Sequence, residues 1–335
     1  MYLLGGVLFL FFLTNMMGGV FYMWILLEMV FFFVIFYLIL TCYKKVNLSS
    51  IVYYLFIQAL GGIMLMCSFL IEMFYFGNFY FFNSSISWIC FFLGLMSLLI
   101  KMGVFPFYLQ IYKIMGFMNF NQIFMFMVYP KVVPMVMLYN LIGGVDFQLN
   151  GILILPSLLL LISGFQGIYS SDIREILAWS GMSQLSWIFV GILGNFFFFF
   201  FFFMLYSFLL YYMCFTLFGS GSKVYYDYLL VGGSYYGNFI MLILIFLMSG
   251  LAPFFMFYMK LFLIFEIMNY SVVFLFMMLL GSSGIFFFYI RIVQMSLSLG
   301  GSFYYFISNN YSFKLNYSLM FIFSFFFLGG ILILI

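Results

Sequence analysis

Apolar runs of roughly 20 residues, separated by short polar breaks, follow one another along almost the whole chain. A run of this length is what an α-helix needs to cross the hydrocarbon core of a bilayer. Only 5% of the residues are charged, 69% are hydrophobic, and the mean hydropathy is +1.31. These values indicate a polytopic, all-α membrane protein in contact with lipid, and residues 1–335 leave no room for a soluble domain.

The polar breaks predict about eleven transmembrane helices. The expected spans are 3–18, 21–43, 50–73, 84–112, 121–142, 150–168, 173–194, 195–218, 237–265, 271–293 and 316–335. With this division, the basic residues of the connections fall on one side of the membrane. They are Lys44, Lys45, Lys113, Arg174, Lys223, Arg291 and Lys314, whereas Glu72, Asp146 and Glu266 fall on the other side. The positive-inside tendency therefore places the N-terminus on the interior side.

Four ionisable residues lie inside the apolar runs instead of at their ends: Glu28, Lys101, Lys131 and Lys260. A charge at the centre of a membrane helix costs about 2.5–3.5 kcal/mol even on the translocon-insertion scale. A bundle that accepts this cost repeatedly usually moves protons or ions through those sites. These four residues are the candidate functional site.

Two of the expected spans carry a glycine and a proline near their middle, with a lysine close by. The segments are Lys101–Phe107 (KMGVFPF) and Ser249–Lys260 (SGLAPFFMFYMK). Proline removes an amide donor and clashes one turn back, so each helix is expected to break there. The two breaks are five spans apart, which predicts an inverted repeat of five-helix units. We expect the first repeat at 1–142, the second at 150–296 and an extra helix at 316–335.

Glu28 is the best partner for Lys101, because Glu72 and Glu266 both fall at span ends, where water is expected to reach them. Two interpretations stay open: a static ion pair, or a pair whose separation sets the proton affinity of the lysine. Lys131 has no acid nearby in sequence, which suits a proton carrier.

The seventh span adds polar residues that share one helical face. They are Ser180, Ser183, Gln184 and Trp187. This face fits either helix–helix contacts or the lining of a water chain.

The sequence contains no histidine, which excludes histidine-ligated haem, copper centres and imidazole relays. Its cysteines are far apart, at Cys42, Cys67, Cys90 and Cys214, and have no CxxC spacing. We therefore expect no metal or iron–sulfur site in this chain.

Five segments follow one another along the chain: Trp24–Met29, Lys101–Tyr108, Lys131 with Pro134, Arg174–Trp187 and Ser249–Lys260. In this order they resemble the antiporter-like membrane subunits of respiratory complex I. The resemblance implies that Glu28 and Lys101 form a gating pair, Lys131 is the central carrier and Lys260 is the exit-side lysine. It implies proton translocation in the mitochondrial inner membrane, beside other membrane-arm subunits and with the basic loops facing the matrix. It also implies that other subunits bind NADH, FMN, iron–sulfur clusters and ubiquinone.

The sequence departs from the family pattern at three positions. Tyr108 and Gln184 stand where the family commonly has histidine, and Ala252 replaces the first proline of a doublet. A stand-alone cation/proton antiporter is the alternative function, and a purely structural membrane scaffold is a third. No nucleic acid is expected as a partner.

Overall fold

The computed structural model describes residues 2–16, 19–41, 45–76, 88–143, 149–194, 196–218, 235–250, 254–268 and 272–299. Every regular element in these ranges is an α-helix, as the apolar runs predict. The first half contains α1 (Tyr2–Met16), α2 (Val20–Thr41), α3 (Lys45–Phe76), α4 (Trp88–Met102), α5 (Leu109–Met115) and α6 (Phe120–Gly143). The second half contains α7 (Leu149–Tyr169), α8 (Ile173–Leu193), α9 (Phe196–Phe218), α11 (Tyr235–Ser249), α12 (Phe255–Met268) and α13 (Val272–Leu299). The span expected at 316–335 lies outside the described residues.

Seven helices in the described ranges are long and apolar enough to cross a bilayer on their own. They are α2, α3, α6, α7, α8, α9 and α13. Large apolar side chains on the outer helices, such as Phe36 on α2 and Phe276 on α13, are exposed in the isolated chain. Exposed apolar faces of this kind are what lipid contact requires. The chain is a multi-pass helical membrane protein.

The two expected helix breaks are present. The span expected at 84–112 is divided into α4 and α5, and the span expected at 237–265 into α11 and α12. The residue after α4 is Gly103, with a φ of 66°, and the residue after α11 is Gly250, with a φ of 72°. Only glycine adopts this left-handed conformation without a steric penalty. Pro253, which the sequence places in the second break, lies outside the described residues.

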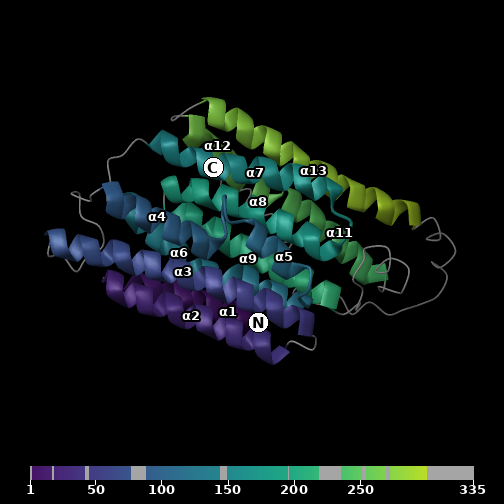
Figure 1. Ribbon diagram of the computed structural model, residues 1–335. Coiled ribbons are helices and arrows are strands. Elements are labelled where there is room, and N and C mark those ends of the chain that lie inside the picture. Colours follow the sequence, from purple (N-terminus) through teal and green to yellow (C-terminus); the bar gives the residue numbers. More distant parts are fainter. Residues whose placement is uncertain are drawn as a thin grey trace.

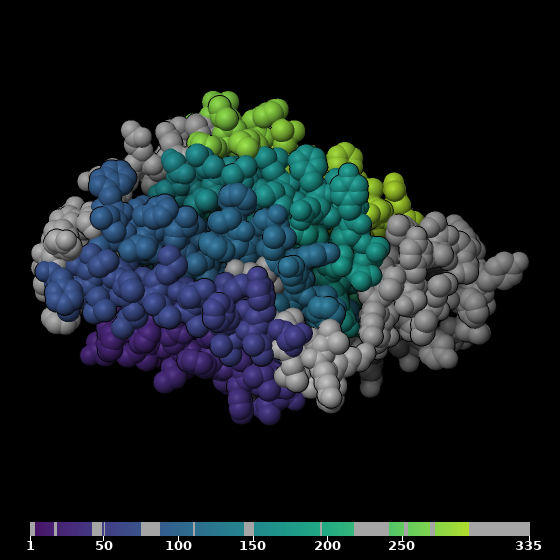
Figure 2. All heavy atoms as spheres, viewed as in Figure 1, coloured from purple at the N-terminus to yellow at the C-terminus, as the bar shows by residue number. Residues whose placement is uncertain are grey.

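The core of the molecule is built on α6 and α8. Helix α6 contacts α1, α2, α4, α8 and α9, and almost every described side chain of α6 and α8 is buried. Figure 1 shows α2 and α3 on one flank and α7 with α13 on the opposite flank. The space-filling view shows the same two flanks, purple to blue and green to yellow (Figure 2). Charged groups on α6 are therefore shielded from lipid.

Two described arginines of the helix connections, Arg174 and Arg291, lie at neighbouring helix ends. The Arg174 guanidinium donates a hydrogen bond to the Gly116 carbonyl at 3.2 Å, joining the start of α8 to the end of α5. Arg291 on α13 donates to the carbonyls of Ile168 and Ser170 at the end of α7. Helix ends that carry these residues thus lie together, as the sorting of basic residues predicts for this part of the chain.

Helices α7 and α13 approach each other closely through glycines, and a methyl group there is expected to destabilise the bundle. A Cβ on Gly164 would lie 2.6 Å from the Gly281 carbonyl oxygen. Because both are backbone positions in helices, relief requires the helices to move apart. We expect Gly164→Ala to cost about 1–3 kcal/mol and to lower the thermal midpoint of the protein in detergent.

The control for this prediction is Gly151→Ala on the same helix, because a Cβ at that position would meet no described atom within 4 Å. Alanine is a better helix former than glycine, so this variant is expected to be neutral or slightly stabilising. Equal midpoints for the two variants would contradict the close approach.

Candidate functional site

Glu28 and Lys101 form an ion pair between α2 and α4. The Lys101 Nζ donates a hydrogen bond to Glu28 Oε1 at 2.8 Å. The lysine side chain is 2% exposed and the glutamate side chain 16%. The ammonium also lies 4.9 Å from the centre of the Phe31 ring, within range of a cation–π contact. The partner expected for Lys101 from the sequence is therefore in direct contact with it.

Glycine on the neighbouring helix makes room for this pair. A Cβ on Gly62 of α3 would run into the Glu28 carboxylate and come within 3.3 Å of Lys101 Nζ. No larger residue fits at this position without moving the carboxylate.

The first helix break lies directly beside the ion pair. Helix α4 ends one residue after Lys101, so its last carbonyls lack helical partners. Gln58 on α3 supplies donors: its Nε2 lies 3.1 Å from the Ile100 oxygen and 3.4 Å from the Lys101 oxygen. Gln58 was not among the residues predicted from sequence, although a lone amide in the middle of an apolar span was the available signal. The backbone carbonyls at the break therefore have hydrogen-bond donors, which backbone at membrane depth requires.

Lys131 lies on α6 in the centre of the bundle and is 2% exposed. Its Nζ contacts the Met127 sulfur, at 3.4 Å, one helical turn back. No described carboxylate lies within 4.0 Å of this Nζ. Pro130 and Pro134 stand on either side, and α6 continues through both. Each proline leaves one carbonyl on the preceding turn without its helical donor, which makes the backbone around Lys131 unusually polar.

Lys260 bridges the second helix break. From α12, its Nζ donates to the Ser249 carbonyl at the end of α11, at 3.0 Å. The same ammonium lies 5.9 Å from the centre of the Trp187 ring on α8. A Cβ on Gly250 would lie 2.6 Å from this Nζ and would displace the lysine end, and the positive φ of this residue favours glycine. Lys260 has the same role at the second break as Gln58 at the first, because both side chains donate hydrogen bonds to carbonyls in the last turn of the broken helix.

The polar face of α8 is fully buried. Ser180 and Ser183 donate to carbonyls three residues back on their own helix. Gln184 donates from Nε2 to the Met248 carbonyl at 2.9 Å, beside the second break. Its Oε1 and the Trp187 Nε1 have no hydrogen-bond partner among the described residues. The face therefore makes helix contacts and also presents open polar atoms, so both interpretations of it stand.

One expectation about the acidic residues was wrong. Glu72 was expected at a span end within reach of water, but its side chain is buried, at 5% exposed. The reason is that α3 continues one turn further, to Phe76, and keeps Glu72 inside the packed part of the helix. Glu266 on α12 is partly exposed, as expected.

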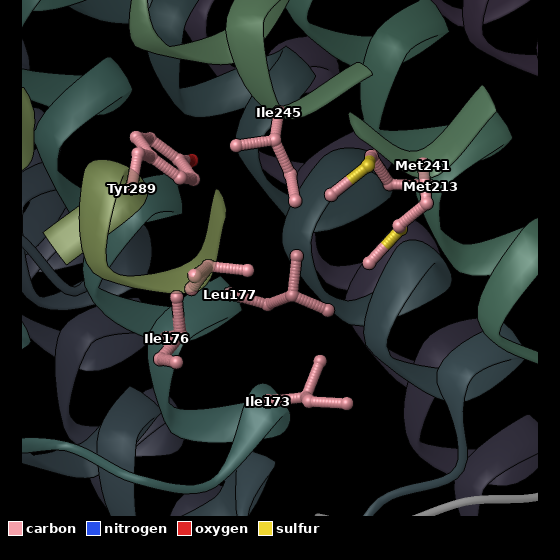
Figure 3. Close-up of a pocket in the computed structure, with 8 residues that line it drawn as sticks. Ile173, Ile176, Leu177, Met213, Met241, Ile245 and Tyr289 are labelled. Atoms are coloured by element: carbon pink, nitrogen blue, oxygen red, sulfur yellow. The ribbon is translucent and has the colours of Figure 1, made fainter. Parts of the chain in front are cut away.

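A small cavity lies between α8, α9, α11 and α13, and none of Glu28, Lys101, Lys131 and Lys260 lines it (Figure 3). Its lining is almost entirely apolar and consists of Ile173, Ile176, Leu177, Met213, Met241, Ile245, Tyr289 and Ile292. It offers no set of polar groups that would orient a polar ligand. The candidate site is therefore the row of buried charged residues and not this cavity.

No protein-family model matches the chain. It is 25% identical over 142 residues to NADH-ubiquinone oxidoreductase chain 2 of Dasypus novemcinctus, covering 42% of this chain and 40% of that protein. The same-named chain of Bos taurus is 28% identical over 93 residues, covering 28% and 26% of the two proteins. The matched regions span less than half the length of these curated relatives.

Three membrane complexes contain chains of similar fold. A chain of the membrane-bound sulfane sulfur reductase, an archaeal respiratory membrane complex, has a TM-score of 0.78 at 13% identity, covering 94% of this chain and 69% of that chain. A chain of the Mrp complex from Dietzia sp. has a TM-score of 0.73 at 15% identity, covering 82% and 56%. A chain of respiratory complex I from Thermus thermophilus has a TM-score of 0.70 at 14% identity, covering 84% and 66%. At these identities the likeness establishes the fold.

The fold and the buried charged residues define a class: polytopic membrane proteins with the helix arrangement of these membrane complexes. Within that class, the sequence is similar to NADH-ubiquinone oxidoreductase chain 2. This similarity confirms the resemblance to the antiporter-like subunits of complex I that the five sequence segments indicate.

Proposed function

We propose that this chain is a proton-translocating subunit of the membrane arm of NADH:ubiquinone oxidoreductase, complex I. The observation that carries the proposal is the Glu28–Lys101 ion pair beside a helix break, with Lys131 and Lys260 buried further along the bundle. Buried charges inside a membrane bundle usually mark ion or proton pathways. The sequence similarity to NADH-ubiquinone oxidoreductase chain 2 supports complex I as the assembly.

In this mechanism, energy from quinone reduction in other subunits shifts the Glu28–Lys101 pair. Separation of the pair changes the electrostatic field at Lys131 and so its protonation state. The charge on Lys131 in turn changes the proton affinity of Lys260. A proton then enters from one side of the membrane and leaves on the other. This chain carries proton translocation and not the redox chemistry, so NADH, FMN, iron–sulfur clusters and ubiquinone are bound by other subunits.

The proposed location is the mitochondrial inner membrane, with the N-terminus and the basic loops on the matrix side. The proposed partners are other membrane-arm subunits of complex I and the lipid bilayer. The proposed repeats, 1–142 and 150–296, each contain one broken helix, α4 with α5 and α11 with α12. Residues 316–335 would add one helix outside the repeats.

A stand-alone monovalent cation/proton antiporter is the second candidate. The fold does not separate the two functions, because chains of the Mrp complex and of complex I share it with this protein. The sequence similarity favours the complex I subunit.

Native electrophoresis of detergent-solubilised membranes distinguishes these functions. With an in-gel NADH dehydrogenase stain and mass spectrometry of the stained band, we expect this chain in a very large, stained assembly. Migration as a small species without the stain would overturn the complex I proposal and favour the antiporter.

A further inference from the structure

Tyr206 on α9 is a buried polar group that the proposed mechanism does not use. Its side chain is 0% exposed, and its hydroxyl has no hydrogen-bond partner among the described residues. Buried hydroxyl groups are almost always hydrogen-bonded, so an unpartnered one calls for an explanation. A group that must exchange hydrogen-bond partners during function is one such explanation.

The side chains of Tyr206 and Met127 both lie against α8 at Gly181, which has no side chain. A Cβ on Gly181 would run into the Met127 methyl group and lie 2.9 Å from the Tyr206 hydroxyl oxygen. The methyl group and the hydroxyl are therefore neighbours, and glycine at position 181 leaves them the space to meet. The Met127 sulfur in turn lies 3.4 Å from Lys131 Nζ. The order through the core is thus Lys131, Met127, Tyr206.

Other polar side chains lie on α8 and α13 near Gly181 and Tyr206. Ser180 stands next to Gly181 on α8 and lies close to the hydroxyl of Tyr289 on α13. Gln184, one turn further along α8, has an open Oε1 and donates to the Met248 carbonyl at the second break. Polar atoms are therefore present near Tyr206, and the Met127 thioether stands between Lys131 and the Tyr206 hydroxyl. Methionine has no proton to donate and is only a weak acceptor.

We propose that the Met127 side chain is a gate between Lys131 and Tyr206, and that Tyr206 is the first proton acceptor beyond this gate. Methionine is unbranched and has three rotatable side-chain bonds, which suits it to swing aside without backbone movement. When it does, the Lys131 ammonium releases one proton, directly or through a water molecule, to the Tyr206 oxygen. In the same concerted step, Tyr206 passes its own hydroxyl proton, through water molecules and the polar groups of α8, to Lys260, which is neutral before the step. Lys131 becomes neutral, the tyrosine stays neutral, Lys260 becomes protonated, and one proton has moved.

This inference rests on the proposed function, because it requires Lys131 to carry protons. Three variants test it in the assembled complex, purified and reconstituted in lipid vesicles. Met127→Gln replaces the thioether with a polar side chain of similar length, and Met127→Leu keeps the position apolar. Tyr206→Phe removes a single oxygen atom. The readouts are the passive proton leak without NADH and the NADH-driven proton-to-electron ratio.

We expect Met127→Gln to raise the passive leak several-fold, because its amide accepts and donates hydrogen bonds where the thioether blocks them. Met127→Leu is expected to leave the leak at the wild-type level. Tyr206→Phe is expected to lower the driven ratio as far as Lys131→Met does, and to suppress the leak when combined with Met127→Gln. Matched controls are Met125→Gln, a buried methionine on α6, and Tyr212→Phe, a partly buried tyrosine on α9. Neither control is expected to alter the leak or the ratio.

The outcomes distinguish a failure of the Met127–Tyr206 relay from a failure of the proposed function. If Lys131→Met leaves the driven ratio unchanged, the proposed function itself has failed. If Lys131→Met lowers the ratio but Tyr206→Phe does not, the function stands and the relay is overturned. Should the polar substitution at Met127 prevent assembly, Tyr206→Phe alone decides, because it is the least disruptive of the three.

Discussion

Replacing Lys131 with methionine is expected to abolish proton translocation by this chain while the complex still assembles. Methionine is about as long as lysine and is itself well suited to an irregular apolar site. The substitution breaks no described ion pair, and the charge that it removes costs about 2.5–3.5 kcal/mol at the centre of a membrane helix. Assembly is therefore expected to be unaffected or improved, whereas a carrier without an ionisable group holds no proton. The measurement is the NADH-driven proton-to-electron ratio in reconstituted vesicles.

The matched control is Lys113→Met, which removes a lysine exposed at the surface of α5. It makes the same chemical change away from the core and is expected to leave the ratio at the wild-type value. A wild-type proton-to-electron ratio in Lys131→Met would contradict the role of Lys131 as a proton carrier. Loss of assembly in Lys131→Met would show instead that the lysine is structural.

The fold follows from sequence because its main determinants are local. An apolar run of the right length has few alternatives to a transmembrane helix, and a glycine followed three residues later by a proline favours a helix break. The breaks at Gly103 and Gly250 were predictable for this reason. The exact ends of α3 were not, since packing against neighbouring helices extends it beyond the polar punctuation and buries Glu72.

The charged members of the site were also predictable, because each stands out against an apolar background. Their partners were harder to find. Gln58 caps α4 from a distance of 42 positions in sequence, and Tyr206 reaches Gly181 from another helix. Contacts of this kind depend on how helices are oriented about their own axes, which the near-uniform hydrophobicity of these spans does not specify. The Glu28–Lys101 pair could be predicted only because the chain has few other acidic residues that could pair with this lysine.

Two interpretations of that pair, a static contact and a switch, make different demands on the structure. A static pair gains little, because replacing a buried ion pair with apolar residues is often neutral or stabilising. A switch needs a partner that can leave. Here Glu28 is the more exposed member, at 16% against 2%, and Lys101 is the second-last residue of α4, directly before the helix break. Those features allow the lysine to move along the bundle while the carboxylate stays on α2, which favours the switch.

Glu28→Gln is expected to stop proton translocation by leaving Lys101 without its counter-charge. Glutamine keeps the size of glutamate and one hydrogen-bond acceptor, so packing against Gly62 is preserved. Removing one partner of a buried pair costs about 3–5 kcal/mol whenever the remaining partner is charged. A change of about 3 kcal/mol shifts the population of such a state more than about a hundredfold. We therefore expect a loss of the driven proton-to-electron ratio, measured beside the amount of assembled complex.

Glu72→Gln is the control, because it neutralises another buried glutamate, on α3, that makes no described ion pair. It is expected to keep both assembly and the ratio. The double variant Glu28→Lys/Lys101→Glu then separates the two interpretations. A static pair works in either orientation, so the exchange would restore assembly and translocation together. A switch that must present a proton on the α4 side toward Lys131 needs the lysine at position 101, so assembly would recover while translocation would not.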